Sequence, residues 1–397
     1  MAIQARLLDP YRALFALPGV GALTVAGFLA QLTQAAGPLG LLLVAEEATG
    51  SLAIGGGVVA AFSLGAGCGR PVQGALIDRR GPSPVLGAAA LLHGGSLVAA
   101  ALLGAGDGPT WALFAAAALA GVSLPAISAS MRILFARLAN ARRDTGFAAI
   151  TVTQELGILL GPAIVGLLVA VTSAPLALGA IAGVATAGTL WFARIPAARE
   201  LPARKATARP RSTGHALAAG LVAVLAVAAL FGGALGAAEV GIPAFAIEHG
   251  HRAASGFLIA AMSIGGVAGG LVVGAVRWSA TATRRAAALL ALVAAGLAVL
   301  AAAPSILTIA LLLVVAGCPI NPAITHIALA VDDRTPAHST AQAFGWMSTG
   351  VALGASVGSA VAGPLAQHVG SDAAFLAAAA SAALGALIAM RTRARVA

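Results

Sequence analysis

Charged side chains are scarce in this sequence. Asp, Glu, Lys and Arg make up 9% of its 397 residues, and Lys205 is the single lysine. A soluble globular protein carries roughly a quarter charged residues, so that class is excluded. Cysteine is nearly absent as well. Cys68 and Cys318 both fall in apolar runs, where we interpret them as small packing residues, and no disulfide is expected.

Long apolar runs fill the chain instead. Hydrophobic residues make up 60% of it, and the mean hydropathy is +0.98. About 20 helical residues cross the ~30 Å hydrocarbon core of a bilayer. Uncharged runs of 18 residues or more recur at 13–45, 48–69, 81–106, 108–131, 156–193, 212–238, 253–276, 286–331, 335–371 and 373–390.

The number of spans follows from these runs. Two of them are long enough for two crossings, with turns expected at Pro175 and Pro304. A further helix that begins near Gly146 and crosses Glu155 brings the count to twelve. No segment alternates polar and apolar residues as the strands of a membrane barrel do. The sequence therefore predicts an all-α polytopic membrane protein, and the first run is too long for the core of a signal peptide.

Arginine predicts the topology. If the N-terminus is cytoplasmic and twelve spans alternate, all but three of the 23 basic residues lie on inner segments. Arg252 lies on an outer loop, and Arg70 and Arg132 lie inside spans. This sorting follows the positive-inside rule, so both termini are predicted to be cytoplasmic. The basic excess serves orientation, and no nucleic-acid partner is expected. Scarce lysine beside abundant Arg, Ala and Gly favours a GC-rich bacterial genome and hence a bacterial cell membrane.

The two halves of the sequence resemble each other. A shift of 200 residues aligns AAFSLGAGCGRPVQGA (60–75) with AAMSIGGVAGGLVVGA (260–275), and AGVSLPAI (120–127) is similar to AGCPINPAI (316–324). Such repeats are common in transporters. We expect an N-terminal six-helix bundle at 1–193, a cytoplasmic linker at 194–215 and a C-terminal six-helix bundle at 216–397.

One charged motif interrupts this pattern, Gly74-Ala75-Leu76-Ile77-Asp78-Arg79-Arg80-Gly81. It resembles the loop between helices 2 and 3 of the major facilitator superfamily, G-x-L-x-D-R-x-G. The resemblance implies a conformational latch in which Asp78 meets the start of the eleventh helix, near His338-Ser339-Thr340, and Arg79 joins a charge network. Arg132 is a further candidate member, or it extends to the lipid headgroups. The alternative for the motif is a solvated turn.

A second motif lies in the fifth span. Gly157, Gly161, Pro162 and Gly166 resemble G-x-x-x-G-P-x-x-G-G, which is linked to antiporters in the same family, although Val165 replaces one glycine. The proline removes a backbone donor and kinks or loosens the helix. An ordinary proline kink is the alternative interpretation.

Two acids inside spans are candidates for proton coupling or substrate contact. Ionisable groups in a bilayer are costly and commonly functional. Glu155 is predicted near mid-membrane with Thr151 one turn earlier on the same face, and Glu239 lies before Pro243, nearer the outer side. A structural hydrogen bond between helices is the alternative role of these acids.

Several uncharged polar residues are predicted to line a central cavity. Thr24, Gln31 and Gln34 share one face of the first span, and a glutamine facing lipid would leave its amide unpaired. Asn321 lies between two prolines in the tenth span, and Trp346 offers an aromatic wall or a packing residue.

These features predict a secondary transporter that moves a small solute by alternating access of two bundles. The fifth-span motif favours proton-coupled efflux. Proton-coupled uptake or facilitated diffusion of a metabolite or sugar stays open, and a non-transporting receptor is a remote alternative. No catalytic arrangement, cofactor or metal site is expected; Glu248-His249-Gly250-His251 lacks a third ligand. The expected partners are the solute, protons and lipid, and the expected state is a monomer.

Overall fold

The computed structural model describes residue 12 and residues 14–106, 108–138, 143–199, 219–275, 280–335 and 340–392. Within these ranges all regular structure is helical. The described residues contain twelve helical spans that are long and apolar enough to cross a membrane. The predicted all-α polytopic fold with twelve spans is therefore confirmed.

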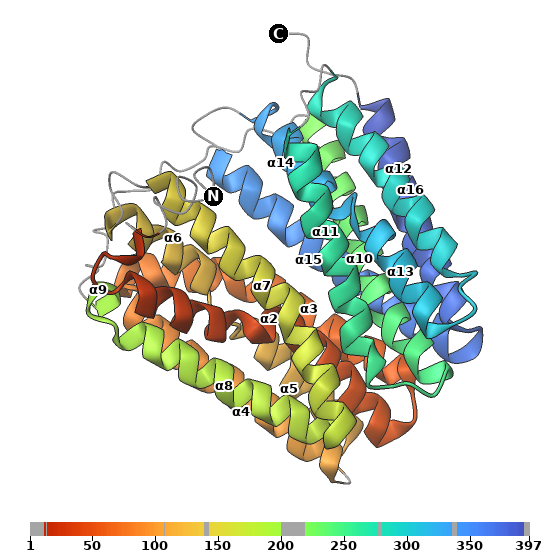
Figure 1. Cartoon of the computed structure of the whole chain (residues 1–397), viewed down its shortest axis with the longest axis horizontal. Coiled ribbons are helices and arrows are strands. Elements are labelled where there is room, and N and C mark those ends of the chain that lie inside the picture. The colour runs from red at the N-terminus through yellow and green to blue at the C-terminus, as the bar shows by residue number, and fades with distance from the viewer. Residues whose placement is uncertain are drawn as a thin grey trace, which may run out of the picture.

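The helices form two bundles, which Figure 1 shows side by side. The first contains α2 (Val20–Thr49), α3 (Leu52–Arg80), α4 (Pro82–Ala105), α5 (Thr110–Val122), α6 (Ile127–Leu138), α7 (Arg143–Val171), α8 (Ala174–Arg194) and the short α9 (Pro196–Arg199). The second contains α10 (Ala219–Glu248), α11 (Ala254–Ala275), α12 (Ala282–Leu300), α13 (Ile306–Gly317), α14 (Ile320–Asp332), α15 (Thr340–His368) and α16 (Ser371–Arg391).

Prolines and glycines set the turns where the sequence indicates them. Pro175 stands in the first turn of α8, and Pro304 lies between α12 and α13. Gly81 adopts φ 80°, a conformation open mainly to glycine. It ends α3, and Pro82 begins α4 with its φ already set for a helix.

Two spans, one in each bundle, are broken. The fourth consists of α5 and α6, and the tenth of α13 and α14. Pro125 and Pro319 stand at these breaks, since a proline cannot donate the backbone hydrogen bond that would continue the helix.

Close glycine contacts repeat between the bundles. A Cβ on Gly69 would overlap the carbonyl oxygen of Val122 on α5, and a Cβ on Gly269 would overlap that of Cys318 at the end of α13. Gly69 and Gly269 are equivalent in the predicted repeat. Helices in lipid associate through such close backbone packing, so the repeat appears in the packing as well as in the sequence.

The two ends of the molecule differ in the segments that they carry. The turn at Gly81 and the end of α8 lie together, because Ser83 Oγ donates to the carbonyl of Ala193 at 2.7 Å. We call this side the linker end, since α8 leads to residues 194–215. The opposite side carries the loop of Arg252 and is called the Arg252 end.

The main contacts between the bundles run along two helix pairs in the half of the molecule near the Arg252 end, with smaller contacts of α10 on α2 and α3. Between α3 and α15, Ser356 Oγ donates to the carbonyl of Ala60 at 2.8 Å, and Gly67 lies against Ala352. Between α7 and α11, a Cβ on Gly166 would lie 2.6 Å from the carbonyl oxygen of Ala253. We call the helix sides turned toward the other bundle the interbundle faces.

Toward the linker end these faces are exposed. Gly74 and Asp78 lie seven and eleven residues after Gly67 and so continue the face of α3 that packs on α15, but both are exposed. The matching positions on α15, Gly345 and Ser348, are exposed as well. The protein is therefore closed at the Arg252 end, and its interbundle faces are accessible toward the linker end.

Candidate functional site

A chain of polar side chains joins α2, α6 and α7 inside the first bundle. Ser128 Oγ on α6 donates to Gln31 Oε1 on α2 at 2.8 Å, and Gln154 Nε2 on α7 donates to Ser128 Oγ at 2.7 Å. Gln31 is buried and also donates to the carbonyl of Gly27 at 3.0 Å. These amides are thus paired, as polar groups away from water must be.

The next residue along α7 extends this chain to the second bundle. Asn321 Nδ2 on α14 lies 3.4 Å and 3.5 Å from the two carboxylate oxygens of Glu155. A Cβ on Gly266 of α11 would lie 3.2 Å from the same nitrogen. Asn321 is therefore held between α11 and the carboxylate of the opposite bundle. We call Gln31, Ser128, Gln154, Glu155 and Asn321 the central cluster.

The fifth-span motif explains why Glu155 reaches the interface. Gly161 faces α2, where a Cβ would lie 2.9 Å from the carbonyl of Leu32. Pro162 and Gly166 face α11 instead, at Gly256 and Ala253. Glu155 precedes Pro162 by seven residues and so shares its face. Gly157 lies beside Gln31, which sets the depth of the cluster.

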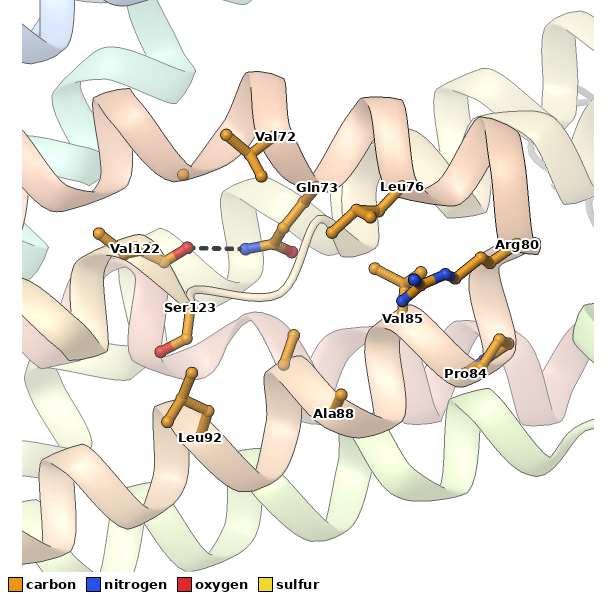
Figure 2. Close-up of a pocket in the computed structure, with 12 residues that line it drawn as sticks. Val72, Gln73, Leu76, Arg80, Pro84, Val85, Ala88, Leu92, Val122 and Ser123 are labelled. Atoms are coloured by element: carbon orange, nitrogen blue, oxygen red, sulfur yellow. Dashed lines mark hydrogen bonds between the residues drawn. The ribbon is translucent and has the colours of Figure 1, made fainter. Parts of the chain in front are cut away.

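A glutamine that the sequence analysis did not single out holds the break in the fourth span. Gln73 Nε2 donates to the carbonyls of Val122 and Leu124 at 3.0 Å and 2.9 Å, and Gln73 Oε1 accepts from the amide of Ala126 at 3.2 Å. Figure 2 shows the side chain reaching from α3 to the break. The sequence feature that could have indicated this role is a glutamine in an apolar helix, directly before Gly74.

The Gln73 contacts connect the latch motif to the central cluster. Ser128, which binds both glutamines of the cluster, follows Ala126 by two residues. A pocket of about 260 Å³ lies beside Gln73 between α3, α4 and α5, with apolar walls and Arg80 among its lining residues (Figure 2).

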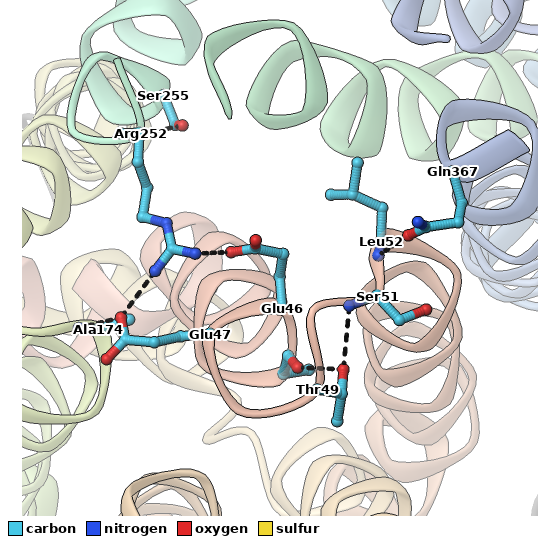
Figure 3. A network of polar contacts seen from close by, with 10 residues as sticks. Glu46, Glu47, Thr49, Ser51, Leu52, Ala174, Arg252, Ser255 and Gln367 are labelled. Carbon is cyan, nitrogen blue, oxygen red and sulfur yellow. Dashed lines mark hydrogen bonds and ion pairs between the residues drawn. The ribbon is translucent and has the colours of Figure 1, made fainter. Parts of the chain in front are cut away.

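Ion pairs close the Arg252 end (Figure 3). The guanidinium of Arg252, in the second bundle, pairs with the carboxylates of Glu46 and Glu47 at the end of α2, at 2.8 Å to Glu47. Glu47 also accepts from the amide of Ala174 at 3.2 Å. Nearby, the amide of Leu52 donates to Gln367 Oε1 at 2.6 Å. The sequence analysis placed Arg252 on an outer loop and did not predict its ion pairs.

The other predicted residues lie outside the central cluster. Glu239 is partly buried on α10, seven residues after Gly232, which packs on α15, and it forms no hydrogen bond or ion pair with another residue in the described ranges. Thr24 is partly buried and donates to the carbonyl of Val20 at 2.9 Å. Gln34 is exposed, three residues beyond Gln31 on the same helix face.

Trp346 is half exposed, and it shares a face of α15 with Leu353 and Val357, two further exposed apolar residues. That face is turned away from the α3 contact at Ala352. This placement gives no support to an aromatic cavity wall.

Of the predicted latch residues, Gly74, Asp78, Arg79 and Arg132 are exposed and Gly81 is buried. Among the residues that the structure describes, Asp78, Arg79 and Arg132 form no ion pair. His338 and Ser339 lie outside those residues, as do the side chains of Thr340 and Thr151. In the same described ranges, no three His, Cys, Asp or Glu side chains come together as a metal would require.

Comparison with known proteins identifies one matching family and many solved structures with the same fold. Residues 23–358 match the family model described as Major Facilitator Superfamily. The crystal structure of the nucleoside transporter NupG is similar with a TM-score of 0.71 and 16% identity, covering 95% of this chain and 99% of NupG. That of the POT family transporter PepTSo has a TM-score of 0.74 and 11% identity, covering 94% and 97%. No curated protein sequence matches the chain.

Proposed function

This chain belongs to the Major Facilitator Superfamily and is a multi-pass membrane transporter of small molecules, not an enzyme, and we propose that it exports its solute in exchange for protons. The linker end faces the cytoplasm in this proposal, because the basic residues gather there. The proposed unit is a monomer, because one chain supplies both bundles and the whole central cluster. The proposed location is a bacterial plasma membrane, because scarce lysine beside abundant Arg, Ala and Gly favours a GC-rich bacterial genome. The bundles are residues 1–193 and 216–397, with the linker at 194–215.

The contact between Glu155 and Asn321 carries the proposal. It is a carboxyl group at the junction of the two bundles, bonded to the opposite bundle. A proton bound to or released from Glu155 changes that bond, and a motion of the bundles changes which side of the membrane reaches Glu155. Protonation and bundle position are thereby linked, as coupled transport requires. Glu239 is the second proposed acid, because it has no polar partner in the described ranges.

The two ends of the molecule supply the gates. In this structure Arg252 binds Glu46 and Glu47, while Asp78 is exposed. In the opposite state the ion pairs of Arg252 break. Gly74 and Asp78 then contact the start of α15, because they lie on the face of α3 that packs on α15. Arg79 and Arg132 supply positive charge to that latch, as the family resemblance implies.

Uptake is the second candidate direction. The cycle runs either way, and the fifth-span motif that favours export has Val165 in place of one glycine. Gln31, Gln34 and Asn321 contact the solute in both directions.

Reconstitution in liposomes tests the function. With a pH dye inside, solutes are screened for proton movement that depends on a solute gradient, and the Glu155→Gln variant is expected to abolish it. Asp332→Asn, at an exposed acid that ends α14, is the matched control and keeps it. The sign of the dye signal distinguishes exchange from cotransport. Unchanged proton-driven transport in E155Q would overturn the proposed role of Glu155.

A further inference from the structure

Arg70 is a cation deep inside a membrane span that the transport cycle described above does not use. It lies on α3, eleven residues before Gly81, which is about 16 Å along a helix. The helix α3 has 29 residues, a length of about 43 Å against a hydrocarbon core of ~30 Å, so Arg70 lies well inside the span. Arg70 is exposed and, within the described ranges, forms no ion pair or hydrogen bond.

Helix geometry turns Arg70 toward the space between the bundles. The face of α3 that packs on α15 includes Gly67, and the face that packs on α2 includes Phe62, whose ring lies against Gly37. At 3.6 residues per turn, Arg70 lies about 60° from Gly67 and about 80° from Phe62, on the side between them. The opposite side of α3 carries the exposed Val72, about 160° from Arg70.

Arg70 also lies near the depth of the central cluster. The helices α2 and α3 run in opposite directions, with Gly55 beside Leu42, and Gly157 of α7 lies beside Gln31. Counting ~1.5 Å per residue from these contacts places Arg70 within about one helical turn of the depth of Glu155. A solute that reaches the cluster from the linker end therefore passes or contacts Arg70.

We propose that Arg70 binds the anionic group of the transported solute, so that the substrate is a small organic anion carrying a carboxylate or a phosphate. The idea rests on the proposed function, in that it places the solute between the bundles. Arginine stays charged and binds both groups through two parallel hydrogen bonds. A cation at this depth needs a counter-charge, and a substrate anion supplies it. Among the described residues Glu155 forms no ion pair with Arg70, and its carboxyl group is bonded to Asn321 instead.

Binding of matched probes to the purified full-length protein tests the charge requirement. The probes are benzoate beside benzamide, succinate beside succinamide, and glycerol 3-phosphate beside glycerol, each scored by the rise in Tm. At least one anion is expected to raise Tm while its neutral counterpart does not. In Arg70→Gln the half-maximal concentration of that anion rises at least about tenfold. Arg70→Lys loses less, and Arg391→Gln, at the exposed end of α16, loses nothing.

A chemical rescue separates charge from shape. Arg70→Cys, made with Cys68→Ala and Cys318→Ala, is expected to lose the response to the anion. A reagent that attaches an aminoethyl group to the thiol restores it, whereas one that attaches a sulfonate does not.

Three results would overturn the proposal: neutral probes that stabilise the protein as well as the anions, an R70Q variant that keeps its response, or a protein that none of the anions stabilises. The assay uses no proton gradient. Anion binding without proton-coupled movement in liposomes would therefore refute the proposed function alone, and the reverse result would refute this inference alone.

Discussion

The side-chain amide of Asn321 binds the carboxylate of Glu155 at 3.4 Å although 166 residues separate them. Each comes from a different bundle, so this hydrogen bond spans the interface that alternating access must open and close. A contact of this kind is tested through the coupling of its two partners.

We expect Glu155→Gln and Asn321→Ala to be non-additive. A hydrogen bond to a charged group contributes about 1.5–3 kcal/mol, so N321A should lower the transport rate by about tenfold or more, while E155Q abolishes proton coupling. Once Glu155 is replaced, the loss of Asn321 should add little. The measurement is solute flux in proteoliposomes for both single variants and the double variant. Multiplicative losses would show that the two residues act independently.

We expect the hydrogen bonds of Gln73 to contribute to the thermal stability of the protein. Gln73→Ala leaves two carbonyls and one amide at the break without their partner, at a cost of about 1–3 kcal/mol for each buried group left unpaired. We predict a Tm lower by several degrees and weaker transport. Val72→Ala is the control, because Val72 is exposed and makes no such bond. Equal Tm values for Q73A and V72A would show that the Gln73 hydrogen bonds do not stabilise the break in the fourth span.

Two glycines on α3 should respond in opposite ways. Gly69→Ala places a methyl group against the backbone of Val122, so the folded yield and Tm should fall. At Gly74 a Cβ meets nothing within 4 Å in this structure. Gly74→Leu should therefore keep Tm and still slow transport, because the linker end must close over that position. A G74L variant that transports like the wild type would remove Gly74 from the latch.

Much of the fold could be predicted because its signals are local. The apolar runs set the twelve spans, and Pro175 and Pro304 mark turns within runs that would otherwise read as single helices. The breaks in the fourth and tenth spans were not predicted, although a proline stands at each. A proline in a span is compatible with a kink or with a break, and packing decides between the two.

The candidate site was predicted in part for a related reason. Charge at mid-membrane indicated Glu155, and the repeat indicated Asn321. Ser128 and Gln154 are uncharged and ordinary by composition, and only the packing of α6 on α7 gives them a role. Glu239 was expected on the same grounds as Glu155, but only Glu155 has a hydrogen-bond partner in the opposite bundle. Which residues surround a side chain depends on helix packing, and the sequence alone does not give that packing.

Orientation is tested by labelling intact cells. With Cys68→Ala and Cys318→Ala as background, a cysteine at Ala208 in the linker should resist a membrane-impermeant maleimide, because the proposal places it in the cytoplasm. A cysteine at Gly250, in the exposed loop between α10 and α11, should react. Permeabilised cells supply the control for reactivity at position 208. Labelling of the linker from outside would reverse the proposed topology and the direction of transport.

The ion pairs of Arg252 should set how often the Arg252 end opens. Exposed ion pairs contribute about 0.2–1 kcal/mol each, and Arg252 has two partners. Arg252→Gln should therefore speed the labelling of a cysteine at Ser356 by roughly twofold to thirtyfold, since that residue lies in the closed contact with α3. The reagent is applied from the Arg252 side, again without the native cysteines.

Two further variants show whether charge is responsible for that effect. Glu47→Gln should have less effect than Glu46→Gln, because the Glu46 side chain is 12% exposed and that of Glu47 is 33% exposed, and a screened pair contributes less. Exchanging the charges, with Arg252→Glu and Glu46→Arg together, should slow labelling relative to R252E alone. If R252Q leaves the labelling rate unchanged, the glycine contacts between the bundles keep this end closed without help from the ion pairs.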